Sequence, residues 1–451
     1  MTKLIRFCII TLVVILLATT IFSTGCGNVP SAPVTSVTLV ESITGDGSGG
    51  AIIAYEIDRS DKDEDIRLQR MGADGTVLWD KILFTSQSNR SSMGGMSGDG
   101  EGSIIIYWTV LVPQNGGGGR SYSKRTIVAR ADTQGQVLWQ KDINKKDVQA
   151  INDGSGGAII IWPDGENLYV QHIGGDGNLL WGKHFPGSGR GLKIISDDKG
   201  GAIFLWDNRD NHCFVVQKLS PSGEALWGKE GIFVEYAASA SEQLPQIISD
   251  GSGGAILTWA ELMDGVQPSY VWVLKIGVDG KVLWKSPVHD LALPPINTLT
   301  RVVRDEDSAI VVWEDLRQGM SLYVQKVSTE GNPLWLENGA PVCTNIPRVS
   351  PRFEVVSNGD GGVVVVWIDG DSRLYAQMLD YYGQRLWSEE GILIATGACH
   401  QPIKLCGDSQ SGFIIGWGTG KEIYHPDKSY LQKLDSTGNL LWGDKGIRLN
   451  P

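Results

Sequence analysis

Four aspartates near the start of the chain are spaced in a way that suits a calcium ion. Asp58, Asp61, Asp63 and Asp65 include a D-x-D-x-D pattern, and carboxylates at such spacing are typical ligands of Ca²⁺. The segment has neither the glycine nor the distal glutamate of an EF-hand loop. Calcium is therefore the one cofactor that the sequence suggests, beside the simpler interpretation of a solvated acidic loop.

The other reactive residue types form no pattern typical of catalysis. The six histidines have no paired spacing for zinc. The serine of Asp-Gly-Ser-Gly-Gly, as at Ser155, follows Gly154 directly, whereas a nucleophile elbow has one residue between them. We therefore predict no catalytic residue.

Cysteine usage suggests at most one disulfide. Cys399 and Cys406 flank a short apolar run, and a disulfide between them would suit an exported protein. The alternative is that these cysteines, with Cys213 and Cys343, are buried small apolar residues. None of them has metal-ligand spacing.

The charge of the chain excludes some partners. The formal net charge is −12 at pH 7. A nucleic-acid-binding surface needs a basic stripe, and electrostatic docking on anionic lipid needs the same. We expect neither.

Most of the chain is an internal repeat, and Asp153–Trp162 with Gly177–Trp181 shows both halves of it. The second half always has Gly, then Leu and Trp three and four residues later. The first half ends in an aromatic residue after an apolar run, with successive copies 44 residues (162 to 206) to 55 residues (107 to 162) apart. The Trp positions are 79, 139, 181, 227, 284, 335, 387 and 442, and the aromatic positions are Tyr55, Tyr107, Trp162, Trp206, Trp259, Trp313, Trp367 and Trp417.

Each copy predicts four short antiparallel strands, A to D. A Gly turn joins A to B, strand B is apolar on both faces, strand C alternates, and strand D is Leu-Leu-Trp. Units of about 40 to 50 residues with four strands are typical of propeller blades. We predict an all-β, eight-bladed propeller of residues 37–451, rather than a seven-bladed ring or an open solenoid. The blades cover about residues 37–84, 90–143, 146–185, 190–234, 244–290, 297–344, 350–396 and 401–450.

The invariant Trp and Gly predict how the blades meet. A large ring at the same place in each blade can pack on the turn of the next blade, where glycine lets the backbone approach closely. We therefore expect the tryptophans mainly to hold blades together.

The first residues look like a targeting segment. Lys3 and Arg6 precede an apolar run from Phe7 to Phe22, which is shorter than the roughly 20 residues of a spanning helix. Ser-Thr-Gly-Cys26 follows, and this resembles a bacterial lipoprotein signal. The resemblance implies a signal peptide over residues 1–25, a lipid on Cys26, a tether over residues 26–36, and a location in the cell envelope, at the outer membrane or cell surface. An ordinary cleaved signal or an uncleaved anchor is the alternative.

The chain also resembles known propellers at the level of its repeats. Ala131–Trp139 (Ala-Asp-Thr-Gln-Gly-Gln-Val-Leu-Trp) and Leu434–Trp442 are similar to repeats of bacterial β-propeller lipoproteins. They also resemble the tryptophan-docking motif of quinoprotein dehydrogenases, a superfamily that includes the lipoprotein scaffold for outer-membrane-protein assembly. Those enzymes usually have adjacent cysteines, which this chain lacks. The resemblance therefore implies the fold rather than a cofactor.

Function is expected where the repeat varies. Strands B–C and D–A are joined on one face of the ring, here called the loop face, by connections of variable length. The uniform Gly turns lie on the other, the turn face. The favoured hypothesis is a lipid-anchored binding or scaffold protein that contacts a protein or glycan through the loop face. The alternative is a hydrolase, lyase or quinoprotein-like enzyme with its site at the mouth of the central channel.

Overall fold

The structure, a computed structural model, describes residues 37–449 with eleven gaps. The gaps are 61–62, 87–90, 101, 115–120, 238–244, 262–268, 292–298, 307, 347–351, 399–402 and 421–427. The predicted signal, Cys26 and the tether lie outside the described residues. In the described ranges, no helix has the length and hydropathy needed to cross a membrane.

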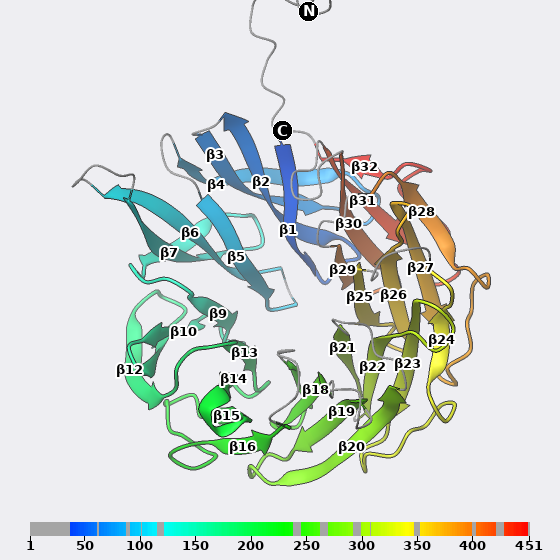
Figure 1. The fold of residues 1–451 in the computed structure, drawn as a ribbon. Helices are drawn as coiled ribbons and strands as arrows, with labels where there is room; N and C mark the ends of the chain where they lie inside the picture. The colour runs from blue at the N-terminus through cyan, green and yellow to red at the C-terminus, as the bar shows by residue number, and fades with distance from the viewer. Residues whose placement is uncertain are drawn as a thin grey trace, which may run out of the picture. The chain divides into compact units, whose positions relative to one another are not determined.

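The described residues form eight four-stranded antiparallel sheets arranged in a ring, so the predicted eight-bladed propeller is confirmed (Figure 1). Each sheet uses four strands that follow one another in the chain. Blades 1 to 4 consist of β1 (Val37–Gly45), β2 (Ala51–Ser60), β3 (Asp63–Met71) and β4 (Val77–Ser86); β5 (Ser91–Gly98), β6 (Ile104–Gln114), β7 (Ser121–Ala131) and β8 (Val137–Asp142); β9 (Gln149–Asn152), β10 (Ala158–Asp164), β11 (Asn167–Ile173) and β12 (Leu179–Pro186); and β13 (Lys193–Ser196), β14 (Ala202–Asn208), β15 (Cys213–Leu219) and β16 (Ile232–Glu235).

The second half of the chain repeats this plan. One turn of 3-10 helix, η1 (Arg209–Asn211), lies between β14 and β15. Blades 5 to 8 consist of β17 (Gln246–Ser249), β18 (Ala255–Glu261), β19 (Ser269–Ile276) and β20 (Val282–Leu291); β21 (Thr300–Asp305), β22 (Ser308–Asp315), β23 (Ser321–Val327) and β24 (Ala340–Cys343); β25 (Arg352–Ser357), β26 (Val363–Ile368), β27 (Arg373–Leu379) and β28 (Ile392–Thr396); and β29 (Lys404–Gly407), β30 (Phe413–Thr419), β31 (Lys428–Leu434) and β32 (Ile447–Arg448).

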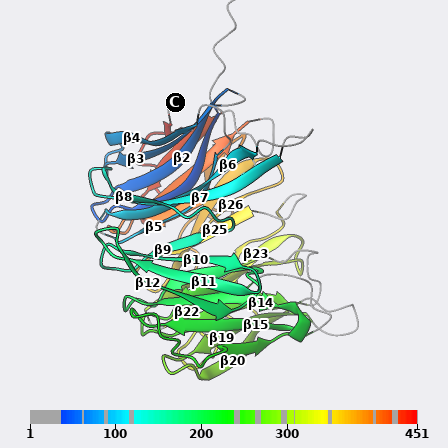
Figure 2. The same ribbon diagram turned by 90° about the vertical axis from the view of Figure 1, so that its left-hand side faces the viewer.

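The first strand of each blade is the innermost, and these eight strands contact one another around the axis of the ring, from β1 and β5 to β29 and β1 (Figure 1). Figure 2 shows the ring from the side, where the strands run between the two faces. The core is divided into eight clusters, each built from the facing sides of two neighbouring blades. Strand B is apolar and buried on both sides, as β18 illustrates. Each blade therefore depends on both neighbours.

The repeated tryptophans dock on the next blade as predicted. A β-carbon added to Gly223 would lie 2.7 Å from the ring of Trp181, and the φ of +76° at Gly223 also favours glycine. All eight repeats show this close approach of Trp to Gly. In seven repeats the indole Nε1 also donates to the carbonyl two residues before that Gly. These pairs, at 2.6–3.3 Å, are Trp79–Thr133, Trp181–Pro221, Trp227–Val278, Trp284–Thr329, Trp335–Tyr381, Trp387–Ser436 and Trp442–Ala73.

The predicted position of strand D is wrong in blades 4, 6, 7 and 8. There the outermost strand begins after a short loop that follows the docking Trp, as β16 follows Trp227. Gln217 holds this loop: its Oε1 accepts from the backbone N–H of Trp227 at 3.2 Å, and its Nε2 donates to the carbonyl of Gly228 at 2.6 Å. The four blades share a glycine with positive φ four residues after the Trp. These glycines are Gly231, Gly339, Gly391 and Gly446.

The aromatic residue at the end of strand B in blade 2 is also corrected. In blade 2 Gly95 pairs with Tyr107, and in blade 1 the equivalent pair is Ser42 with Ala54. Tyr107 is therefore equivalent to Ala54, and Trp108 is equivalent to Tyr55. Trp108 is fully buried between blades 1 and 2, whereas Tyr107 faces blade 3.

A second set of polar contacts joins the blades at the turn face. The turn carboxylate Asp153 accepts from the backbone N–H groups of Ser155 (2.7 Å) and Gly157 (2.8 Å), and its Oδ2 lies 2.7 Å from His172 Nε2. Blades 1, 4, 5, 6 and 8 place Arg or Lys at the position of His172, paired with their own turn aspartate. In blade 7 the pair is Asn358 and Met378, so both charges are replaced together.

These contacts also close the ring. The described residues contain no sheet with strands from both ends of the chain. Instead, Lys433 Nζ of blade 8 donates to the carbonyl of Gly49 in blade 1 at 2.6 Å, and Trp442 donates to Ala73 at 3.2 Å. The seam therefore uses the same contacts as the other interfaces.

We predict that Trp227→Phe destabilises the protein by about 1 kcal/mol more than Trp139→Phe, because Phe keeps the ring but loses the indole donor. Both tryptophans are buried, at 3% and 8% exposed, but only Trp227 Nε1 donates to the next blade. Urea unfolding of both variants measures the difference. Equal losses would show that the hydrogen bond contributes nothing beyond packing.

A pH dependence follows from the buried turn aspartates. Burial alone would raise the pKa of Asp153, but the hydrogen bonds from His172 and the backbone lower that pKa to about 2. The ordinary value is about 4, so this carboxylate stabilises the fold above pH 4 and the stabilisation is lost as the pH falls to about 2. In Asp153→Asn we expect a loss of about 2 kcal/mol at neutral pH and a flatter stability profile between pH 4 and 2. Asp99→Asn, at the exposed equivalent turn of blade 2, should leave both nearly unchanged in urea unfolding at each pH.

Candidate functional site

The proposed calcium ligands lie mostly outside the described side chains. Asp58 and Asp63 belong to strands β2 and β3, so the predicted acidic loop is shorter than expected. Asp65 lies opposite Ile57 in the hairpin and is 2% exposed, so it does not belong to a solvated loop. Among the described residues, no group of three or more carboxylate, imidazole or thiol side chains is placed to hold a metal. Calcium binding by Asp58, Asp61, Asp63 and Asp65 stays a prediction.

The described cysteines are buried thiols. Burial raises the pKa of Cys343 and of Cys406 to about 12, so neither thiol is a nucleophile at neutral pH. Cys213 is buried as well. Cys399 lies outside the described residues, and its pairing with Cys406 stays a prediction.

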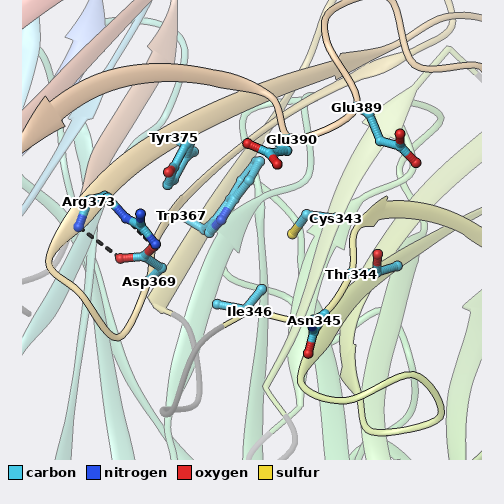
Figure 3. A pocket seen from close by; sticks show the side chains of 10 residues that line it. All are labelled: Cys343, Thr344, Asn345, Ile346, Trp367, Asp369, Arg373, Tyr375, Glu389 and Glu390. Atoms are coloured by element: carbon cyan, nitrogen blue, oxygen red, sulfur yellow. Dashed lines mark hydrogen bonds and ion pairs between the residues drawn. The ribbon is translucent and has the colours of Figure 1, made fainter.

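A cavity of about 380 Å³ opens between blades 6 and 7, and we call it the 6/7 pocket (Figure 3). It is built at the ends of strands, on the side of the B–C and D–A connections. Blade 6 contributes the end of β24 and the residues after it. Blade 7 contributes the end of β26, the start of β27 and the loop after its docking Trp. The lining residues are Cys343, Thr344, Asn345, Ile346, Trp367, Asp369, Arg373, Tyr375, Glu389 and Glu390.

Local structure in blade 7 holds the buried part of this pocket. Asp369 Oδ1 accepts from the backbone N–H groups of Asp371 and Arg373, both at 2.9 Å, and so forms the tight B–C turn. The guanidinium of Arg373 returns to Asp369 Oδ2 at 2.7–2.8 Å. Trp367 and Tyr375 lie opposite each other on β26 and β27, with ring centroids 5.6 Å apart and an interplanar angle of 16°. The wall is thus rigid before any ligand arrives.

The pocket combines an aromatic wall with several hydrogen-bonding groups. Trp367, Asp369, Cys343 and Ile346 are buried, whereas Thr344, Asn345, Glu389 and Glu390 are exposed at the rim. Burial raises the pKa of Tyr375, although Arg373 opposes this, so its hydroxyl is neutral and can donate or accept. The pocket thus combines an apolar wall with a few polar groups, as small-molecule sites usually do, and the Cys343 thiol beside them stays protonated.

The same repeat position carries a second cavity of about 540 Å³ between blades 7 and 8. Trp417 and Tyr430 replace Trp367 and Tyr375, and their rings are stacked in the same way, with centroids 5.7 Å apart. The polar side chains of this cavity are Thr419, Asp444 and Lys445. They differ from the polar side chains of the 6/7 pocket, so we expect the two cavities to prefer different ligands.

In blade 6 the corresponding place is filled by the protein itself. Arg317 lies over the ring of Tyr323 at 3.7 Å from its centroid and donates to the carbonyl of Asn338 at 2.8 Å. It also pairs with Asp315 at 2.6 Å. Asp207 and Arg209 of blade 4, another pair that follows strand B, lie 3.4 Å apart.

Two further cavities lie at other parts of the ring. One of about 560 Å³ is lined mostly by blade 2, including Gly94, Tyr107 and Lys124, with Gln149 of blade 3 and Leu192 of the connection between blades 3 and 4. The other, about 680 Å³, lies at the turn face, where it includes Asp153 and His172. Those two side chains are already bonded to each other and hold the turn.

Sequence reasoning placed function on the loop face but gave none of the pocket residues, such as Cys343 and Trp367, a role in binding. The pockets join segments about 45 residues apart, such as Asn345 and Glu390, and such pairs become neighbours only when two blades pack. One signal was present: Trp367 and Trp417 are followed on strand C by Tyr375 and Tyr430, a repeated aromatic pair.

Comparisons with known proteins place the chain by fold alone. No family model matches it, and no curated protein sequence does. Among solved structures it is similar to the BP39L lectin of Burkholderia pseudomallei, with a TM-score of 0.51 and 12% identity, covering 76% of this chain and 95% of the lectin. The β-propeller domain of the Trilobed protease of Pyrococcus furiosus gives a TM-score of 0.43 and 11% identity, covering 79% of this chain and all of that domain. At such identities the likeness shows that the chain is a β-propeller and nothing about its ligand.

Proposed function

We propose that this chain is a non-enzymatic binding protein of the bacterial cell envelope, tethered by a lipid on Cys26, which recognises a glycan through the 6/7 pocket of its loop face. The 6/7 pocket is the observation that carries the proposal. The lipid tether rests on the resemblance of residues 1–26 to a lipoprotein signal.

The chemistry of the 6/7 pocket suits a sugar ring. A sugar presents hydroxyls that donate and accept, together with apolar C–H faces. The pocket offers donors from Arg373, acceptors from Glu389 and Glu390, and the Tyr375 hydroxyl, beside an aromatic wall. Its volume of about 380 Å³ is of the size that holds one or two small rings. The similar lectin supports the proposal only in that a propeller can carry glycan binding.

A protein partner is the second candidate, and one observation favours it. The leucine before each docking Trp is present in all eight blades although it is 46–58% exposed. Packing within a blade does not require such exposure, whereas an apolar belt around the ring would serve a scaffold for other envelope proteins. These leucines are Leu78, Leu138, Leu180, Leu226, Leu283, Leu334, Leu386 and Leu441.

We predict that Tyr375→Phe weakens glycan binding about tenfold, because the variant keeps the ring stacked on Trp367 and loses one hydrogen bond to the ligand. The measurement is a glycan array, followed by calorimetry with the best ligand. Tyr430→Phe, at the same position of the 7/8 pocket, is the matched control and should retain binding.

The same array separates the alternatives. An array without any bound glycan would contradict the proposal, and crosslinking to one envelope protein would then favour the scaffold. Conversion of an array glycan into a product would favour the enzyme alternative.

We predict that the mature chain begins at a lipid-modified Cys26, because residues 1–26 resemble a signal that is cleaved before its lipidated cysteine. Mass spectrometry of the N-terminal peptide measures this, and Cys26→Ala should lose both the lipid and the cleavage and so retain residues 1–25. A natural chain whose N-terminus carries no lipid would favour an ordinary cleaved signal, and a natural chain that retains residues 1–25 would favour an uncleaved anchor.

A further inference from the structure

The innermost strands place one residue each at the same depth, polar in seven blades and a glycine in blade 2, and we call this ring the collar. Each collar residue lies four positions before the turn Asp or Asn of its blade, and each is half-buried. Because the innermost strands contact one another around the axis, equal positions in them face the same level of the ring (Figure 1). The collar residues are Ser42, Gly95, Gln149, Lys193, Gln246, Arg301, Glu354 and Lys404.

Neighbouring collar residues bond to each other across blade interfaces. Arg301 and Glu354 form a two-pronged ion pair, with Nε and Nη2 at 3.2 Å and 3.1 Å from the two carboxylate oxygens. Lys193 Nζ donates to Gln246 Oε1 at 3.0 Å. The amide of Gln149 donates to the carbonyl of Leu192, the residue before Lys193.

The charges of the collar do not balance at Lys193. The charge of Arg301 is matched by Glu354. Lys404 lies near the carboxylate of Glu41: burial raises the pKa of Glu41, and the charge of Lys404 opposes that rise. Lys193 is bonded to a neutral amide oxygen. Burial, and after it the charge of Arg301, lowers the pKa of Lys193 to about 8. At pH 7 this ammonium is thus still mostly protonated, in a place where a buried charge is costly unless an opposite charge joins it.

A cavity on the loop face lies next to this position, although Lys193 is not among the residues that line it. Gln149 and Leu192 line the cavity of about 560 Å³ described above, so the cavity reaches the residue next to Lys193. At the turn face, Arg304 of blade 6 bonds to Asp198 of blade 4 at 2.7 Å, and this pair spans part of the opening on that side. A ligand would therefore approach Lys193 from the loop face.

We propose that the part of the collar around Lys193 is an anion site, in which Lys193, supported by the field of Arg301 and the amide of Gln246, binds the oxyanion of a carboxylate or phosphate group. The site is separate from the inter-blade pockets and does not depend on glycan binding there. It would give a protein with a net charge of −12 a local preference for an acidic group at its axis.

The test is calorimetry of the full chain in detergent, with sodium acetate as the carboxylate probe and inorganic phosphate as the other. The acetate and phosphate arms show which group the site prefers. Because Lys193 is about half protonated at pH 8, binding should take up about half a proton per anion at that pH and almost none at pH 6. Titration in buffers of different ionisation enthalpy measures this uptake.

Three variants assign the effect. Lys193→Gln should bind at least about tenfold more weakly, since it loses a charged hydrogen bond. Lys193→Arg should still bind but without proton uptake at pH 8, because the guanidinium stays protonated. Lys404→Gln, at the collar position beside Glu41, is the matched control and should retain both binding and uptake.

Two results would overturn the proposal. In the first, neither acetate nor phosphate binds to the folded chain. In the second, Lys193→Gln binds the anion as tightly as the natural chain does, with an unchanged circular dichroism spectrum; either result would show that the collar only packs the blades together.

Discussion

Every blade of this protein is a sheet with two apolar faces, and this is the constraint on which the rest of the structure depends. Strand B is buried on both sides, so no sheet can bury its surface without a neighbour on each side. The eight core clusters accordingly lie between blades rather than within them. Docking of Trp on the next turn then sets the spacing, because the approach of ring to glycine leaves no room for a β-carbon.

Such a ring is uniform, and the cavities described above differ where single blades depart from the repeat. Arg317 and Arg373 both pair with the aspartate of their own B–C turn, but Arg317 also lies close over Tyr323 and donates to Asn338, whereas Arg373 lies beside the 6/7 pocket. A difference of a few residues in one B–C turn therefore accompanies the difference between these two interfaces. At the axis, one position per innermost strand, the collar, likewise changes its residue from blade to blade.

The parts of the fold that depend on residue identity could be predicted from the sequence. The number of blades and the docking of Trp on Gly follow from residues that recur in all eight copies. The position of strand D was missed because the Leu-Trp pair is the same in every copy. What differs is one glycine, such as Gly231, that turns the chain before the strand begins. Tyr107 was chosen over Trp108 because two adjacent aromatic residues look alike without the strand register.

The sites were harder to predict for a physical reason. The 6/7 pocket joins Asn345 of one blade to Glu390 of the next, and the collar takes one position from each innermost strand. Neither is marked by a residue type that recurs in all eight blades. Both depend on how far two sheets are rotated about the axis, and this rotation is a property of packing rather than of any local segment.

The seam between blades 8 and 1 also bears on the history of the chain. Lys433, Gly49, Trp442 and Ala73 make at the seam the contacts that other residues make at the other interfaces. No strand crosses from one end of the chain to the other in the part that the structure describes. The ends of the gene could therefore have been placed between any two blades. Duplication or circular permutation by whole blades would keep the contacts between neighbouring blades. The order of the inter-blade pockets around the ring could therefore change while the core packing stays the same.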